Sequence, residues 1–160
     1  MERYFAVFNM GFDSDGSQLD YGRFSVNHVD DDGTGGTDLI VMATMATSRK
    51  QGRDDFNERG GLMPPQYRVP AFGTKSTWQI DTKRQNNSNL GGLCYQVLPV
   101  YITTENQISR GEFFLHRNLN GVGSLGCTVF DSQRLQQVAK VLDEINSKGQ
   151  DRIPYFVYYS

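Results

Sequence analysis

The stretch "FFLHRNLNGVGSLGCTVF", Phe113–Phe130, contains one of the two histidines of the chain and one of its two cysteines. A short apolar segment ends at His116, and a loop with glycines at 121, 123 and 126 leads to Cys127. A loop of this length and glycine content lets a chain leave a strand, turn and return, so His116 and Cys127 can face each other across a tight turn. The pattern leaves two interpretations open: a catalytic cysteine–histidine pair, and a glycine-rich hairpin with a buried cysteine.

The first interpretation requires a specific set of groups around the thiol. A nucleophilic cysteine needs a base that takes its proton, and His116 is the nearby candidate. It also needs backbone N–H groups close to the carbonyl oxygen under attack, and Gly126 permits that close approach. Cys94, by contrast, alternates with apolar neighbours, which predicts a small buried hydrophobic residue.

Most of the remaining sequence predicts β-strands. The 17 glycines and 8 tyrosines favour a β-rich protein, and runs of aromatic and β-branched residues alternate with turn clusters. We predict a loop over Lys83–Gly92. The predicted strands are Arg3–Asn9, Gly22–Val29, Asp38–Ser48, Tyr67–Val69, residues 76–80, Leu93–Thr103, Gly111–His116 and Ile153–Tyr159.

One helix is predicted, over about residues 132–148. Leu135, Val138, Leu142 and Ile145 recur at helical spacing and form an apolar stripe. Asp131 or Ser132 can cap its start, and Gly149 follows its end (two further helix signals). Without repeats or a linker, residues 1–160 are expected to form a single, mainly β domain.

Composition disfavours several classes of function. The net charge is −2 with no basic stripe, so we expect no nucleic-acid partner. The cysteines and histidines lack zinc-site spacing, so neither a metal nor a cofactor is predicted. No segment has the length and apolar character of a membrane span. The N-terminus lacks the core of a signal peptide, so we expect synthesis in the cytoplasm.

The stretch Phe113–Phe130 also resembles the catalytic motif of the L,D-transpeptidase (YkuD) family. In that family a strand ends in a histidine, and a loop leads to Ser/Thr-x-Gly-Cys; here these are His116 and the run from Ser124 to Cys127. Upstream, "GGLMPPQYRV" (60–69) is similar to the family's Gly-x-x-Pro-x-x-Tyr stretch. The short histidine-to-cysteine loop is closest to compact members in phage-associated proteins and secreted antibacterial effectors.

The resemblance implies a β-sandwich-like catalytic domain that acts on peptidoglycan stem peptides. Cys127 would attack a peptide carbonyl after losing its proton to His116, and a thioester would form. Backbone N–H groups around Gly126, helped by Ser124, would hold the oxyanion. Arg117 stands where the family usually has glycine, so Arg117 or Arg110 is a candidate for binding a substrate carboxylate, with solvent-facing arginines as the alternative.

Several alternatives to transpeptidation or D-amino-acid exchange stay open. Water as the acceptor would give an L,D-carboxypeptidase or endopeptidase, and loss of activity would leave a wall-binding or virion domain. A papain-like amidase is disfavoured, because its cysteine usually precedes its histidine. Wall chemistry without a visible leader favours action at the periplasm or cell wall after delivery by a phage or secretion system. Candidate partners are then a delivery machine, a phage particle or an immunity protein.

Overall fold

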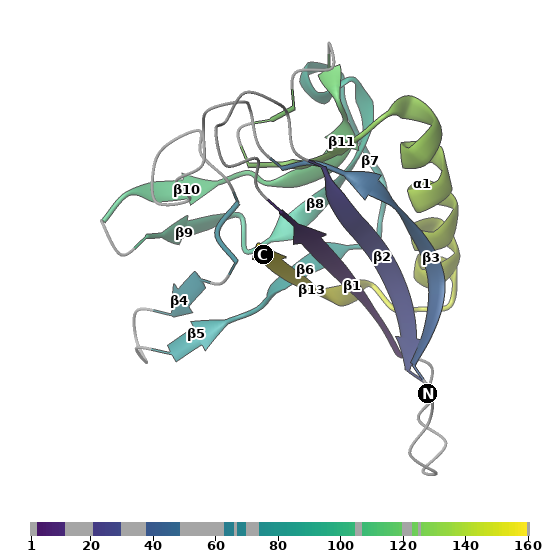
Figure 1. Ribbon diagram of the computed structural model, residues 1–160, viewed down its shortest axis with the longest axis horizontal. Coiled ribbons are helices and arrows are strands. Elements are labelled where there is room, and N and C mark those ends of the chain that lie inside the picture. The colour runs from purple at the N-terminus through teal and green to yellow at the C-terminus, as the bar shows by residue number, and fades with distance from the viewer. Residues whose placement is uncertain are drawn as a thin grey trace.

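The computed structural model describes residues 3–11, 21–29, 38–48, 63–65, 67–69, 74–104, 107–119, 123–124 and 126–159. Within these residues the fold is mainly β, with a nine-stranded mixed sheet, two two-stranded sheets and one main helix (Figure 1). The prediction of a mainly β chain with one main helix is confirmed.

The large sheet has the strand order β12-β11-β8-β6-β13-β1-β2-β3, and β7 pairs with β8 beside this path. Its strands are β1 (Arg3–Met10), β2 (Gly22–Val29), β3 (Asp38–Ala46), β6 (Trp78–Asp81), β7 (Gln85–Asn87), β8 (Gly92–Leu98), β11 (Phe114–Arg117), β12 (Thr128–Phe130) and β13 (Arg152–Tyr159). The small sheets are β4 (Tyr67–Val69) with β5 (Thr74–Ser76), and β9 (Tyr101–Thr103) with β10 (Ser109–Gly111). In Figure 1 both small sheets lie on the side of the molecule away from the helix.

The two end strands of the large sheet meet. Directly after β3, the Thr47 N–H donates to the Val129 carbonyl at 3.1 Å, and the Val129 N–H donates to the Thr47 carbonyl at 2.8 Å. Because Val129 lies in β12, this antiparallel bridge joins the last strand of the order to the first. The sheet therefore curls round its own core, and its strands face one another across it.

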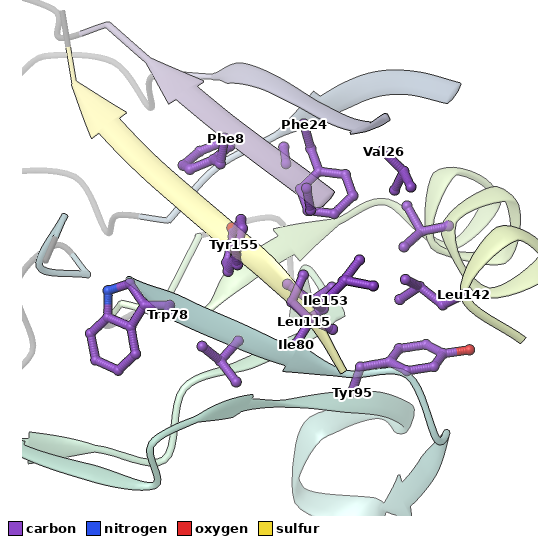
Figure 2. Packing of buried hydrophobic residues seen from close by; sticks show 14 of the residues in the cluster. Phe8, Phe24, Val26, Trp78, Ile80, Tyr95, Leu115, Leu142, Ile153 and Tyr155 are labelled. Carbon is purple, nitrogen blue, oxygen red and sulfur yellow. The ribbon is translucent and has the colours of Figure 1, made fainter. Parts of the chain in front are cut away.

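The core is rich in aromatic residues from strands that are distant in the sheet order (Figure 2). The Phe24 ring of β2 packs edge-on against Phe130 of β12, with ring centroids 5.1 Å apart, and against Tyr155 of β13 at 5.9 Å. All three side chains are buried. In β1 the buried positions alternate along the strand from Tyr4 to Met10, the period expected of a strand with one face on the core.

The helix α1 (Ser132–Ser147) lies beside β3 and closes the core along its apolar stripe (Figure 1). The four predicted stripe residues are all buried, together with Ala139. Asp131 is the N-cap, because its carboxylate accepts from the Arg134 N–H at 2.8 Å. Gly149 follows the helix with φ +88°, as a helix-ending glycine does. Tyr95 of β8 donates from its hydroxyl to Asp143 at 2.7 Å and fixes the helix to the sheet.

Four predicted elements differ in detail. The predicted strand at residues 76–80 is divided between β5 and β6, and the predicted strand Gly111–His116 between β10 and β11. The predicted loop Lys83–Gly92 contains β7 and a short 3₁₀ helix, Ser88–Leu90, because the backbone of Gln85–Asn87 pairs with β8 as a tight hairpin. The predicted strand Leu93–Thr103 is divided into β8 and β9. The side chains of Gln85–Asn87 are polar, so their sequence lacks the apolar alternation that predicts a strand, although their backbone still pairs with β8.

The return of the chain after His116 was predicted wrongly. β12 runs parallel to β11, with Leu115 opposite Thr128 and His116 opposite Val129, so the glycine loop carries the chain back to the start of β11 before β12 begins. A hairpin would have placed Cys127 opposite His116. In a parallel pair, the residue before β12 lies beside the beginning of β11 instead.

Candidate functional site

The strand register places Cys127 and His116 on one face of β11 and β12. Leu115 and Thr128 are opposite each other and point into the core, where Thr128 shares a hydrogen bond with the Tyr155 hydroxyl. Successive side chains of a strand alternate between faces, so Cys127 and His116 share the other face. They are offset by two residues, which is roughly 6–7 Å along the strands.

The Cys127 thiol binds backbone groups at the beginning of β11. Its sulfur accepts from the Phe114 N–H at 3.3 Å, and its S–H donates to the Glu112 carbonyl at 3.7 Å. Burial raises the pKa of this thiol to about 11, and the Phe114 N–H and the Arg110 charge oppose that shift. The resting thiol is therefore protonated at neutral pH.

His116 is buried and is oriented by its own strand. Its Nδ1 lies 2.7 Å from the Arg117 carbonyl, which can only accept, so Nδ1 carries a hydrogen and Nε2 keeps its lone pair in the neutral ring. Burial lowers the pKa of His116, and the Arg117 carbonyl opposes that shift. Among the described hydrogen bonds, none joins the His116 ring to the Cys127 sulfur. The two groups form a neutral base and a neutral thiol on the same face.

Gly126 is required by both conformation and space. Its φ is +115°, a region that L-residues with a side chain rarely adopt. A Cβ at this position would lie 2.5 Å from Phe113 Cε1 and 2.8 Å from Arg110 Nη2. The absent side chain therefore lets a ring and a cation pack against the turn that precedes Cys127.

Ser124 stabilises the same turn, since its hydroxyl donates to the Cys127 carbonyl. Because the Ser124 hydroxyl already donates to this carbonyl, the candidate donors to an oxyanion are backbone N–H groups. In the described part of the chain, no hydrogen bond occupies the N–H groups of Gly126 and Cys127. Two adjacent N–H groups next to a thiol are what an oxyanion hole requires.

The two predicted carboxylate-binding arginines lie in different places. Arg110 of β10 is buried, and its guanidinium lies over the Phe113 ring, 5.2 Å from the centroid, next to Gly126. Its charge is close enough to lower the pKa of Cys127. The Arg117 side chain is exposed and lies beside Gly91, at the turn before β8. The structure thus brings Arg110, and not the Arg117 side chain, to the cysteine.

One group at the thiol was missed from the sequence, and Cys94, which is buried as predicted, proves to lie on the same side of the sheet. Glu112 has φ +56° and supplies the carbonyl that accepts the S–H, and no residue pattern indicated that backbone turn. Cys94 lies opposite His116 in the pairing of β8 with β11, so it shares the face of the candidate site. Both cysteines are free thiols, and β11 lies between their strands, which is too wide a separation for a disulfide.

The described residues contain no group of three or more histidine, cysteine and acidic side chains that could hold a metal ion. In that same part of the chain, α1 and the 3₁₀ helix fall short of the length and apolar character that a membrane crossing needs. Residues 60–69 of the upstream motif are described only for 63–65 and 67–69.

Comparison with known proteins gives no assignment: no protein-family model matches the chain, and no curated protein matches it.

Proposed function

We propose that the chain is a cysteine-dependent acyltransferase that acts on peptidoglycan stem peptides, in the manner of an L,D-transpeptidase. The observation that carries the proposal is the arrangement around Gly126. A turn with φ +115° presents Cys127 on the same strand face as a neutral, oriented histidine, next to two N–H groups that no hydrogen bond within the described residues occupies. The substrate class comes from the motif resemblance of His116, Ser124, Gly126 and Cys127.

The reaction begins with loss of the thiol proton. Because both groups are neutral at rest, Cys127 transfers its proton to His116 Nε2 as the sulfur attacks the carbonyl carbon before a D-residue. The side chains must first close their offset along the strands, as catalytic hydrogen bonds often tighten only with substrate. The N–H groups of Gly126 and Cys127 hold the tetrahedral oxyanion.

Collapse of this intermediate breaks the peptide bond. The leaving amine takes the proton from His116, and the acyl group remains on Cys127 as a thioester. A second stem-peptide amine, or a free D-amino acid, then attacks the thioester, loses a proton to His116, and releases the thiol. Water at that step gives a carboxypeptidase or endopeptidase product instead.

A catalytically inactive, wall-binding domain is the second candidate. One observation favours it: the thiol is hydrogen-bonded to Phe114 and Glu112 rather than to His116, and its pKa is raised. The two candidates differ in whether any covalent change of a stem peptide depends on Cys127.

Mass spectrometry of muropeptides incubated with the protein tests the proposal. Tetrapeptide muropeptides with a D-amino acid acceptor should yield exchanged, cross-linked or trimmed products with the wild type and with Cys94→Ala. Product formation should be lost in Cys127→Ala and fall by about 10²–10⁴-fold in His116→Gln. A wild type that leaves every muropeptide unchanged, yet binds sacculi, would favour the wall-binding domain.

A further inference from the structure

Two consecutive backbone carbonyls of the upstream motif accept hydrogen bonds from aromatic side chains. The Tyr159 hydroxyl, at the end of β13, donates to the Met63 carbonyl. The indole N–H of Trp78, at the beginning of β6, donates to the Pro64 carbonyl at 2.7 Å. Met63, Pro64 and Trp78 are buried, and a buried carbonyl that loses its donor is costly. Both donors therefore fix this short segment in place.

Tyr159 also contacts the strand that pairs with the cysteine-bearing strand. Its hydroxyl oxygen lies 3.2 Å from Ser48 Oγ. Ser48 directly follows Thr47, whose backbone exchanges two hydrogen bonds with Val129, two residues beyond Cys127. One phenol thus links the Met63 carbonyl to the strand end that holds β12.

Trp78 reaches the cysteine turn by a separate route. Its ring packs edge-on against Phe113, with centroids 5.4 Å apart and an interplanar angle of 83°. The Phe113 ring in turn fills the space beside Gly126 and lies under the Arg110 guanidinium. Met63 and Pro64 are therefore connected to the nucleophile turn from two sides, through different strands.

We infer that Tyr159 and Trp78 are positioning residues that hold the Met63–Pro65 segment at a fixed place relative to the Cys127 turn, so that the turn keeps the orientation in which its thiol and N–H groups meet the acyl-donor peptide. The orienting role rests on the proposed function. We call the contacts of Tyr159 and Trp78 with Met63–Pro65 the clamp. The clamp itself rests on the hydrogen bonds and ring contacts alone. Neither side chain takes part in the proton transfers, so their loss should affect substrate placement more than the chemical step.

Tyr159→Phe tests the clamp, with Tyr158→Phe as the matched control, since Tyr158 is the exposed neighbour on the same strand. In muropeptide turnover, Tyr159→Phe should raise KM by about fivefold to tenfold and change kcat by less than about twofold. Tyr158→Phe should change neither. A lower thermal midpoint with unchanged KM would mean that the phenol is merely structural, and would overturn the inference.

Amide hydrogen exchange provides a readout that does not need activity. Tyr159→Phe should speed exchange in the peptides that contain Met63 and Cys127, but not in the pairing of β1 with β13. Ser48→Ala and Trp78→Phe should affect the Cys127 peptide in the same direction. Unchanged exchange at that peptide in all three variants would overturn the clamp. Faster exchange with an inactive wild type would instead overturn only the proposed function and the orienting role.

Discussion

Gly126 and Gly149 show how a positive φ serves different purposes at two residues. Both have positive φ, +115° and +88°. A Cβ on Gly149 would meet nothing within 4 Å, whereas one on Gly126 would overlap Phe113 and Arg110. Gly149 therefore ends a helix, and Gly126 also makes room for the groups that surround Cys127.

This difference predicts unequal effects of two alanine substitutions. Gly126→Ala should lower the free energy of unfolding by about 2–5 kcal/mol, since backbone strain and overpacking add. Gly149→Ala should cost only the backbone strain, about 1 kcal/mol. Urea unfolding of both variants checks this, and equal losses would contradict the packing at Gly126.

The thiol pKa predicts how the cysteine reacts with alkylating reagents. With a pKa of about 11, roughly one thiol in a thousand is ionised at pH 8, well below the fraction for an unperturbed cysteine. Iodoacetamide should therefore modify Cys127 slowly at pH 7–8, and the rate should keep rising above pH 9. Mass spectrometry of Cys94→Ala at each pH follows the one remaining thiol. A plateau reached near pH 7 would contradict the burial and the hydrogen bonds assigned to the sulfur.

At the scale of single residues, the sequence indicated the candidate site residues but not how they are held in place. Cys127, Gly126 and His116 could be selected as candidate site residues because the sequence gives both their residue types and their spacing. The sulfur's partners are backbone atoms of Glu112 and Phe114, and backbone conformation at Glu112 follows from tertiary packing rather than from its side chain.

The helix and the strand pair beside it differ in how far local pattern determines them. The α1 stripe, cap and terminating glycine are all local signals: the stripe and the glycine were predicted correctly, and the cap, Asp131, is one of the two residues predicted for it. The strand β12 was not predicted, because it contains only Thr128–Phe130, and its pairing with β11 and Thr47 depends on contacts distant in sequence.

The start of α1 permits a sharp test, because the sequence left Asp131 and Ser132 as alternative caps. The carboxylate of Asp131 accepts from the Arg134 N–H, so Asp131→Ala should lower stability by about 0.5–2 kcal/mol. Ser132 is an exposed first residue of the helix, and Ser132→Ala should change stability by less than about 0.5 kcal/mol. Thermal unfolding compares the two, and a larger loss in Ser132→Ala would show that the cap is misassigned.

For the whole molecule, closure of the sheet brings its first and last strands around one core. Thr47 and Val129 join β3 to β12, and the Phe24 ring of β2 reaches Phe130 of β12 across the interior. Strand content could be predicted from alternation, but this closure could not, because it depends on pairings between segments far apart in the chain.

A double-mutant cycle measures that contact across the core. Phe24→Leu and Phe130→Leu should each destabilise the fold, and the double variant should lose about 0.5–1.5 kcal/mol less than the sum, because one edge-to-face pair is counted twice. Pairing Phe24→Leu with Gly149→Ala supplies an additive control, because a Cβ on Gly149 would meet nothing within 4 Å. Strict additivity of the two phenylalanine changes would contradict the closed arrangement.

Capture of the acyl-enzyme tests the central claim most directly. Cys94→Ala protein, incubated with tetrapeptide muropeptides and quenched in acid, should carry a tripeptide-containing adduct on Cys127, detected by intact-mass and peptide mass spectrometry. The terminal D-residue should appear free in at least equal amount, and Cys127→Ala should carry no adduct. A wild type that forms no adduct on Cys127 and releases no D-residue beyond the Cys127→Ala background would contradict the assignment of Cys127 as the nucleophile.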